Sequence, residues 1–260
     1  MKYTTLVLML STLLPLPARA DNPARRMMEQ VRRRANWHDM TGRVELILEQ
    51  KNGGRRRRLM KLWSQTNERD ETRMLLRLVE PADVRGTGFL LIEHAAGEDD
   101  RRLFLPALRR VQRISASGKG GAFMSSDFTY YDIGAPELDD WRFSLGADRR
   151  LGDVTCRTVV GRAASHQVSK DTGYSRVTWF IDGRRLLILG AEFHDQEGTL
   201  FKRLTVEKVE NVNGVPFATA MRMENLLTGH RSEMRFFDLR VNQGLASSIF
   251  SERNLRRWTR

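Results

Sequence analysis

Alternation of apolar and polar residues, the pattern of a half-buried β-strand, recurs along most of the chain. In residues 43–49, Val44, Leu46 and Leu48 alternate with charged side chains, and residues 52–54 (Asn-Gly-Gly) follow with the chemistry of a hairpin turn. The same pattern, with Gly, Asn and Asp between the runs, predicts strands over 43–49, 55–64, 72–80, 87–94, 101–105, 154–162, 174–182, 186–194, 199–210, 215–225 and 231–241.

These strands predict a mainly β fold with some helix. About eleven antiparallel strands joined by short hairpins form one large sheet, curved or partly closed into an incomplete barrel. No internal repeat, low-complexity tract or long linker divides the sequence. We therefore expect a single domain over residues 21–260.

The segment 23–36 has the period of a helix instead. Asn22-Pro23 is a helix start signal, and Met28 and Val31 lie one turn apart while arginines occupy the other face. This helix is one expected cover for the concave face of the sheet.

A second cover is expected after a Ser/Gly/Lys loop in the middle of the chain. Met124, Phe128 and Tyr131 would share one face of a helix over residues 123–132. Residues 247–258 predict a further short helix at the C-terminal end.

Residues 1–20 have the pattern of a secretory signal peptide. A basic start at Lys2 precedes the apolar run Leu6–Leu16, and Ala18-Arg19-Ala20 completes a small-residue cleavage site. The run is shorter than the ~20 residues of a transmembrane helix; a buried N-terminal helix is the alternative. We expect cleavage after Ala20 and a periplasmic mature chain.

The charge balance indicates an anionic partner. Lys and Arg total 44 against 32 acidic residues, a net charge of +12, which attracts nucleic acid, acidic glycans or anionic lipid. Export argues against nucleic acid. The basic groups Arg55–Arg58 and Arg109, Arg110 and Arg113 are either a solvated edge or a patch for peripheral contact with an anionic membrane surface.

The sequence offers no catalytic, cofactor or metal motif. The five histidines are widely spaced, no Gly-x-Ser-x-Gly elbow is present, and Gly118-Lys119 lacks the context of a phosphate loop. The single cysteine, Cys156, excludes an internal disulfide and is expected to be a buried strand thiol. We therefore expect a protein that is not an enzyme.

Several strands are apolar on both faces, among them Phe89–Ile92 and Trp179–Ile181, and eleven methionines add adaptable side chains. Such strands need cover on each side. Helices cover part of this surface, and the remainder is either plain core or a site for an apolar ligand.

The stretch 103–114 (LFLPALRRVQRI), followed by 123–132 (FMSSDFTYYD) and preceded by 86–90 (GTGFL), resembles a signature of the exported outer membrane lipoprotein-sorting protein family, which is LolA-like. The resemblance implies a half-barrel whose apolar concave face is lidded by helices. It also implies an association with large export pumps of the resistance-nodulation-division (RND) type.

We therefore expect a carrier that holds the acyl chains of a lipid or lipoprotein in an apolar groove. Open alternatives are a sensor or adaptor that binds a protein partner such as an RND-type pump in the same groove and, with less support, a lipid hydrolase. The candidate residues are wall residues Leu91, Trp179, Phe193 and Met221, lid residues Met124, Phe128 and Tyr131, and headgroup residues Arg109, Arg110 and Arg113.

Overall fold

The computed structural model describes residues 22–34, 37–94 and 97–257, so the predicted signal peptide at 1–20 lies outside the described residues. The described helices are α1 (Pro23–Arg33), α2 (His166–Thr172) and α3 (Glu252–Arg256). None of them is long and apolar enough to cross a bilayer.

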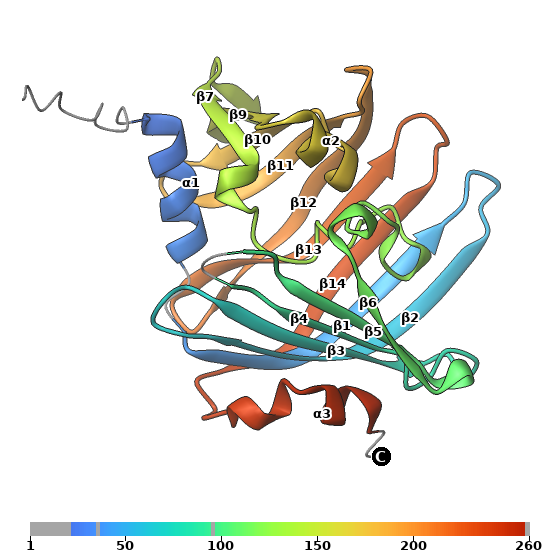
Figure 1. Ribbon diagram of the computed structural model, residues 1–260. Coiled ribbons are helices and arrows are strands. Elements are labelled where there is room, and N and C mark those ends of the chain that lie inside the picture. The colour runs from blue at the N-terminus through green and yellow to red at the C-terminus, as the bar shows by residue number, and fades with distance from the viewer. Residues whose placement is uncertain (1–21, 35–36, 95–96, 258–260) are drawn as a thin grey trace, which may run out of the picture.

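A single antiparallel sheet dominates the described part of the chain (Figure 1). Thirteen strands lie in the order β6-β5-β4-β3-β2-β1-β14-β13-β12-β11-β10-β9-β7, and a fourteenth, β8, pairs with β9. The end strands β6 and β7 are not paired with each other, so the barrel stays open. The strands are β1 (Asp39–Glu49), β2 (Arg55–Thr66), β3 (Thr72–Glu80), β4 (Gly88–Ile92), β5 (Asp100–Leu105), β6 (Arg110–Ile114), β7 (Trp141–Leu145), β8 (Arg149–Leu151), β9 (Val154–Ala163), β10 (Arg176–Asp182), β11 (Leu187–His194), β12 (Leu200–Val212), β13 (Val215–Asn225) and β14 (Arg231–Val241).

The strand count corrects the expected eleven to fourteen. The three strands that the pattern missed are β6, β7 and β8, which are only three to five residues long and lie at or beside the edges of the sheet. Edge strands are short and polar because this discourages pairing with other chains. The sequences of β6 and β8 therefore lack the apolar alternation on which the prediction depended, whereas β7 has it over only five residues (Trp141, Phe143 and Leu145 with polar residues between them).

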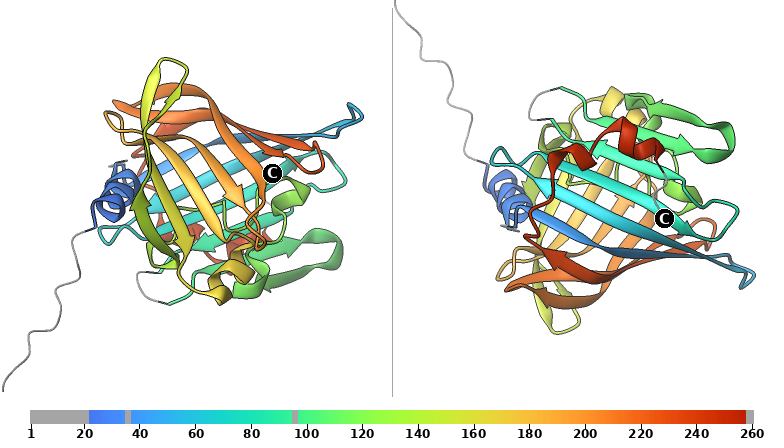
Figure 2. Two further views of the ribbon diagram at one scale, coloured as in Figure 1. Left: turned by 90° about the horizontal axis from the view of Figure 1, so that it is seen from above. Right: turned by 90° about the horizontal axis from the view of Figure 1, so that it is seen from below.

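The sheet bends into two facing halves, β1–β6 and β7–β12, joined through β13 and β14 (Figures 1 and 2). Pairing registers shift in β1–β14, β2–β3, β10–β11, β11–β12 and β12–β13. Such bulges bend a strand and increase its twist. The concave face is thereby left with a volume that other segments must fill.

Helix α1 covers one end of this concave face. The side chain of Asn22 accepts hydrogen bonds from the backbone N–H groups of Ala24 and Arg25, and Pro23 occupies the first turn, so the predicted start is confirmed. Ala24 and Met28 are buried against the sheet. The helix ends at Arg33, because Arg34 is already the C-cap.

The predicted helix at residues 123–132 is wrong. The segment forms a short 3₁₀ turn, Phe123–Ser125, followed by further turns, and Met124 has a left-handed backbone with φ of 49°. The Ser126 hydroxyl donates to the carbonyl of Phe123 at 2.6 Å, and the backbone N–H of Thr129 donates to Asp132 at 2.7 Å. These local side-chain contacts compete with a helix.

The outer face of β2–β5 is covered by the C-terminal segment (Figure 2). Leu75 and Leu90 pack there against Phe250 and Leu255, whereas Leu91 belongs to the core on the concave side. The expectation that residues 89–92 need cover on both faces is thus confirmed. The predicted C-terminal helix is present as a 3₁₀ turn at 247–249 and α3.

Candidate functional site

A cavity of about 350 Å³, partly open to solvent, lies inside the half of the sheet that contains β10–β13. This volume is at the lower end of the ~300–1,000 Å³ range of small-molecule sites. Three parts of the chain line it: α1, the irregular segment 128–138, and the inward side chains of β10–β13. The lining residues are Met28, Val31, Arg32, Arg34, Phe128, Tyr131, Asp132, Gly134, Ala135, Pro136, Leu138, Val177, Trp179, Leu187, Ile188, Phe193, Leu204, Val206, Phe217, Ala218, Met221 and Met223.

Five of the seven side chains expected at an apolar groove line this cavity: Phe128, Tyr131, Trp179, Phe193 and Met221. Their assignment as ligand contacts remains a prediction.

Leu91 and Met124 are buried in the same core and do not line the cavity. They lie on the side of β1–β6, where Phe89, Phe123 and Tyr130 pack with ring centroids 5.4–5.8 Å apart. These rings pack together in that half of the interior, whereas the cavity described above lies in the half that contains β10–β13.

Aromatic rings form one wall of the cavity. Trp179 packs edge-on against Trp141 with centroids 5.6 Å apart, and the indole N–H of Trp141 donates to the hydroxyl of Tyr131 at 2.8 Å. The wall requires Gly161, since a Cβ atom there would lie 2.6 Å from Cζ3 of Trp179. The hydrogen bond fixes Tyr131, so this wall has a defined shape.

The cavity also has a polar corner at Asp132. Its Oδ2 accepts from the hydroxyl of Tyr174 at 2.8 Å and from the backbone N–H of Thr129 at 2.7 Å. Burial raises the pKa of the Asp132 carboxyl, an effect that the nearby ammonium of Lys202 opposes. Burial likewise lowers the pKa of Lys202 and raises that of Tyr174 well above its usual value.

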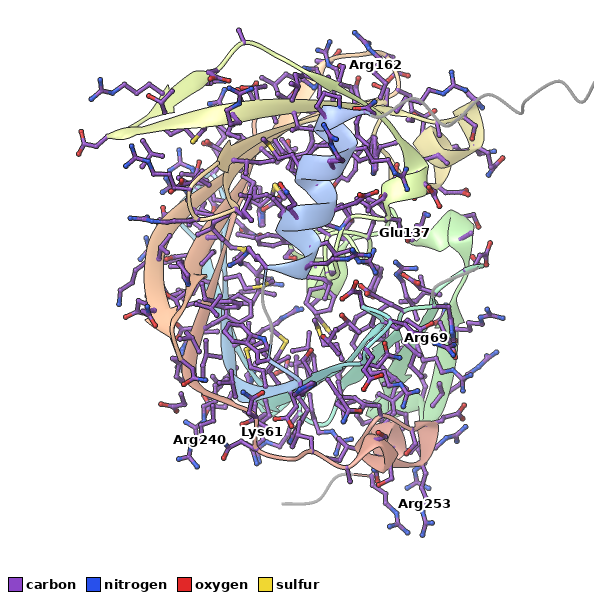
Figure 3. The ribbon with its side chains drawn as sticks, turned by 90° about the vertical axis from the view of Figure 1, so that its left-hand side faces the viewer. Lys61, Arg69, Glu137, Arg162, Arg240 and Arg253 are labelled. Atoms are coloured by element: carbon purple, nitrogen blue, oxygen red, sulfur yellow. The ribbon has the colours of Figure 1, made fainter. Side chains whose placement is uncertain are left out.

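Figure 3 shows α1 between the two facing halves of the sheet. Two arginines of this helix hold it in place. Arg25 donates to Asp139 at 2.7 Å and to the carbonyl of Leu138 at 3.2 Å. Arg32 pairs with Glu93 at 3.0 Å.

Glu93 is a junction between three segments. Its Oε2 accepts from Arg32 and from the backbone N–H of Thr72 at 3.3 Å, and its Oε1 accepts from the backbone N–H of Ala135 at 3.2 Å. Burial raises the pKa of the Glu93 carboxyl, against the opposing effect of Arg32. One buried carboxylate thus connects α1 to β3 and to the irregular segment 128–138, which lines the cavity.

Arg34 is the remaining charge at the cavity. Its guanidinium donates to the carbonyl oxygen of Pro216, and burial lowers its pKa. The sequence interpretation missed Arg32, Arg34 and Asp132. The available signal was the position of Arg34, three residues after the apolar Val31 and therefore one turn along the buried face.

The three arginines expected near a headgroup lie elsewhere. Arg109, Arg110 and Arg113 are exposed on the β5–β6 hairpin and do not line the cavity. Arg113 lies 3.7 Å from Asp100. Contact of these residues with a headgroup remains a prediction.

One Ser, one His and one Asp converge outside the cavity. The hydroxyl of Ser232 donates to Oδ2 of Asp127 at 2.6 Å, and Nδ1 of His230 lies 2.6 Å from the same oxygen. Ser232 is fully buried and bonds the aspartate rather than the histidine, so it lacks the base that activates a serine nucleophile. The cluster instead attaches the segment around Asp127 to β14.

Cys156 is buried and free, as expected from the sequence, and burial raises the pKa of its thiol. Within the described residues, no group of His, Cys, Asp and Glu side chains has the arrangement of a metal site.

The sequence and the fold have counterparts among known proteins. A family model described as an uncharacterized protein matches residues 70–257. A domain from Vibrio parahaemolyticus, classed as an outer membrane lipoprotein-sorting protein, is 32% identical; 90% of this chain and 98% of that chain are covered, with a TM-score of 0.83. A DUF1329 family protein from Desulfovibrio piger is 25% identical, with 90% and 100% covered and a TM-score of 0.83.

A LolA superfamily protein from Nitrosomonas europaea is 20% identical, with 89% of this chain and 98% of that chain covered and a TM-score of 0.70. It shares the fold. No protein with a curated description matches the chain.

Proposed function

Because this chain belongs to the DUF1329 family of outer membrane lipoprotein-sorting proteins, we propose that it is a periplasmic carrier that holds acyl chains of a lipid or lipoprotein in its cavity. The resemblance found in the sequence is thereby confirmed, as is the open, mainly β, LolA-like fold. The signal peptide, cleaved after Ala20, delivers the mature chain to the periplasm.

The apolar cavity is the observation that carries this proposal. Burial of an acyl chain is favourable by ~0.8 kcal/mol per CH₂ group, so twelve buried carbons represent about 10 kcal/mol before the ordering of chain and pocket is subtracted. A carrier needs only such a space and a way to open it, and no covalent chemistry. The arrangement of α1 and segment 128–138 over the cavity supports these two segments as the movable cover.

Lipid extraction tests the carrier function directly. The mature protein is purified from an envelope fraction and extracted with organic solvent, and the extract is analysed by mass spectrometry. Uptake of a fluorescent acyl probe is then measured for the wild type and for Met221→Trp, which fills the cavity. Leu145→Trp, at an exposed position outside the cavity, is the matched control.

We expect co-purified lipid and probe uptake by the wild type and by Leu145→Trp, and reduced uptake by Met221→Trp. Absence of lipid together with no probe uptake contradicts the carrier proposal. A stable protein partner recovered without lipid, such as an RND-type pump, supports the adaptor alternative instead.

We further propose that the carrier contacts an anionic membrane surface with the rim opposite α1, formed by the tips of the β1–β2, β5–β6 and β13–β14 hairpins (Figures 1 and 2). Leu108 and Leu227 on these tips are 67% and 65% exposed, and Lys51 and Arg109 are exposed beside them. Each basic residue near an anionic surface contributes ~1 kcal/mol. Binding to phosphatidylglycerol vesicles but not to phosphatidylcholine vesicles, weakened in Arg109→Glu, is the expected result; equal binding to both contradicts it.

A further inference from the structure

Three charged side chains line the otherwise apolar cavity, and two of them already have an opposite charge. Arg32 pairs with Glu93 at 3.0 Å. Asp132 accepts two hydrogen bonds, and Lys202 lies close enough to oppose the rise in its pKa. Neither residue needs a ligand to satisfy its charge.

Arg34 differs from both. No carboxylate of the described residues pairs with it, and its partner, the carbonyl oxygen of Pro216, is neutral. A guanidinium has five N–H donors in a planar fork that fits a carboxylate or a phosphate. Most of these donors have no partner among the described residues, and the group is half-buried at the cavity.

A half-buried cation is costly unless an anion compensates it. Among the other residues that line the cavity, Asp132 alone carries a carboxylate, and that carboxylate accepts from Tyr174 and lies near Lys202. The missing partner must therefore carry a negative charge at one end and apolar groups behind it. The volume of about 350 Å³ suits one such molecule.

We propose that the cavity binds a single-chain amphiphile with an anionic head, whose carboxylate or phosphate pairs with Arg34 and whose acyl chain lies against the aromatic wall. This inference rests on the carrier function proposed above and specifies its ligand. A neutral lipid of the same length is bound less tightly, since it leaves the guanidinium without a counter-charge.

The test compares ligands of equal chain length. Affinities for palmitate, for monopalmitoyl lysophosphatidic acid and for uncharged hexadecanol are measured by displacement of a fluorescent acyl probe. The variants are Arg34→Gln, Arg34→Lys and the control Arg33→Gln, which alters the neighbouring arginine whose side chain is 71% exposed. Hexadecanol binding also reports whether the cavity of each variant is intact.

We expect the wild type to bind an anionic ligand at least tenfold more tightly than hexadecanol, the scale of a hydrogen-bonded charge. Arg34→Gln should lower the affinity for the anionic ligands to about that for hexadecanol. Arg34→Lys should retain part of it, and Arg33→Gln all of it. The anionic ligand with the larger gain in affinity over hexadecanol, palmitate or the lysophosphatidic acid, identifies the head group.

Two other outcomes are distinguishable. Equal affinity of the wild type for all three ligands overturns the role of Arg34 and leaves the carrier function standing. No binding of any ligand by the folded wild type overturns the carrier function itself.

Discussion

The junction at Glu93 makes a quantitative prediction about the cover of the cavity. The Glu93 side chain is 4% exposed, and the Arg32 side chain that pairs with it is 24% exposed. Removal of one partner of a buried pair costs ~3–5 kcal/mol, because an uncompensated charge stays behind. Since Arg32 is partly exposed, we expect Arg32→Gln to lower the free energy of unfolding by about 3 kcal/mol at pH 7, near the lower limit.

This loss corresponds to a fall of about 6–12 °C in the unfolding temperature of a domain of this size. The matched control is Arg33→Gln on the same helix. Its partner Asp70 is exposed, so that pair contributes at most about 1 kcal/mol. Thermal and urea unfolding of both variants measure the difference.

The pH dependence gives a second check of the same reasoning. Burial raises the pKa of Glu93 in the folded protein, so the folded state binds a proton at a higher pH than the unfolded chain does. The loss in Arg32→Gln should therefore shrink as the pH falls from 7 and Glu93 takes up a proton.

A double-mutant cycle completes the test. Glu93→Gln removes the charge but leaves a single carbonyl oxygen, so one of the two backbone N–H groups of Thr72 and Ala135 loses its acceptor. Because the double variant leaves no uncompensated charge, it should still lose less stability than the sum of the single variants. Equal losses for Arg32→Gln and Arg33→Gln, or strictly additive effects in the cycle, would refute the reasoning.

Three further changes have expected outcomes. Arg77 donates to the carbonyls of residues 254, 255 and 257 at the end of α3, so Arg77→Met should cost about 1–3 kcal/mol in urea unfolding and expose the C-terminal segment to limited proteolysis; unchanged cleavage would contradict this. Gly161→Val should displace Trp179, costing about 1–3 kcal/mol and shifting tryptophan fluorescence. Burial raises the pKa of Asp132, so the stability that the Asp132 carboxyl contributes falls as the pH rises through its pKa in the folded protein. The stability of Asp132→Asn relative to wild type should increase between pH 4 and 7, and a pH-independent difference would count against it.

The fold was largely predictable because two local signals agreed along the chain. Alternation and turn residues located eleven strands, and the two-faced run at 89–92 correctly required a cover on each side. Two of the missed strands had no such signal, since β6 is polar or half-exposed throughout and β8 has three residues. The third, β7, does alternate, but over only five residues. The wrong prediction of a helix at 123–132 arose because this segment is packed between the two halves of the sheet. A segment in such a place has apolar residues whatever its backbone conformation, so their helical spacing carried no information.

The site was predictable only in its apolar part. Phe128, Trp179 and Phe193 stand out as large apolar residues wherever they fold. An arginine in the sequence is expected on the surface instead, since most arginines are solvated. Arg34 and Arg109 look alike in the sequence, and only the tertiary structure places one at the cavity and the other on a hairpin tip.

The position of the cavity in one half of the interior indicates where the proposed carrier would open. On the side of β1–β6, Phe123 and Tyr130 pack against Phe89. The hollow side is bounded by α1 and segment 128–138, which are joined to the sheet through Glu93. Charged groups are therefore concentrated where α1 and segment 128–138 meet the cavity. Ion pairs can hold this cover in place, whereas apolar packing would close it permanently. A ligand that brings its own anion to Arg34 would bind at this same boundary, so loading and opening would act on one set of contacts.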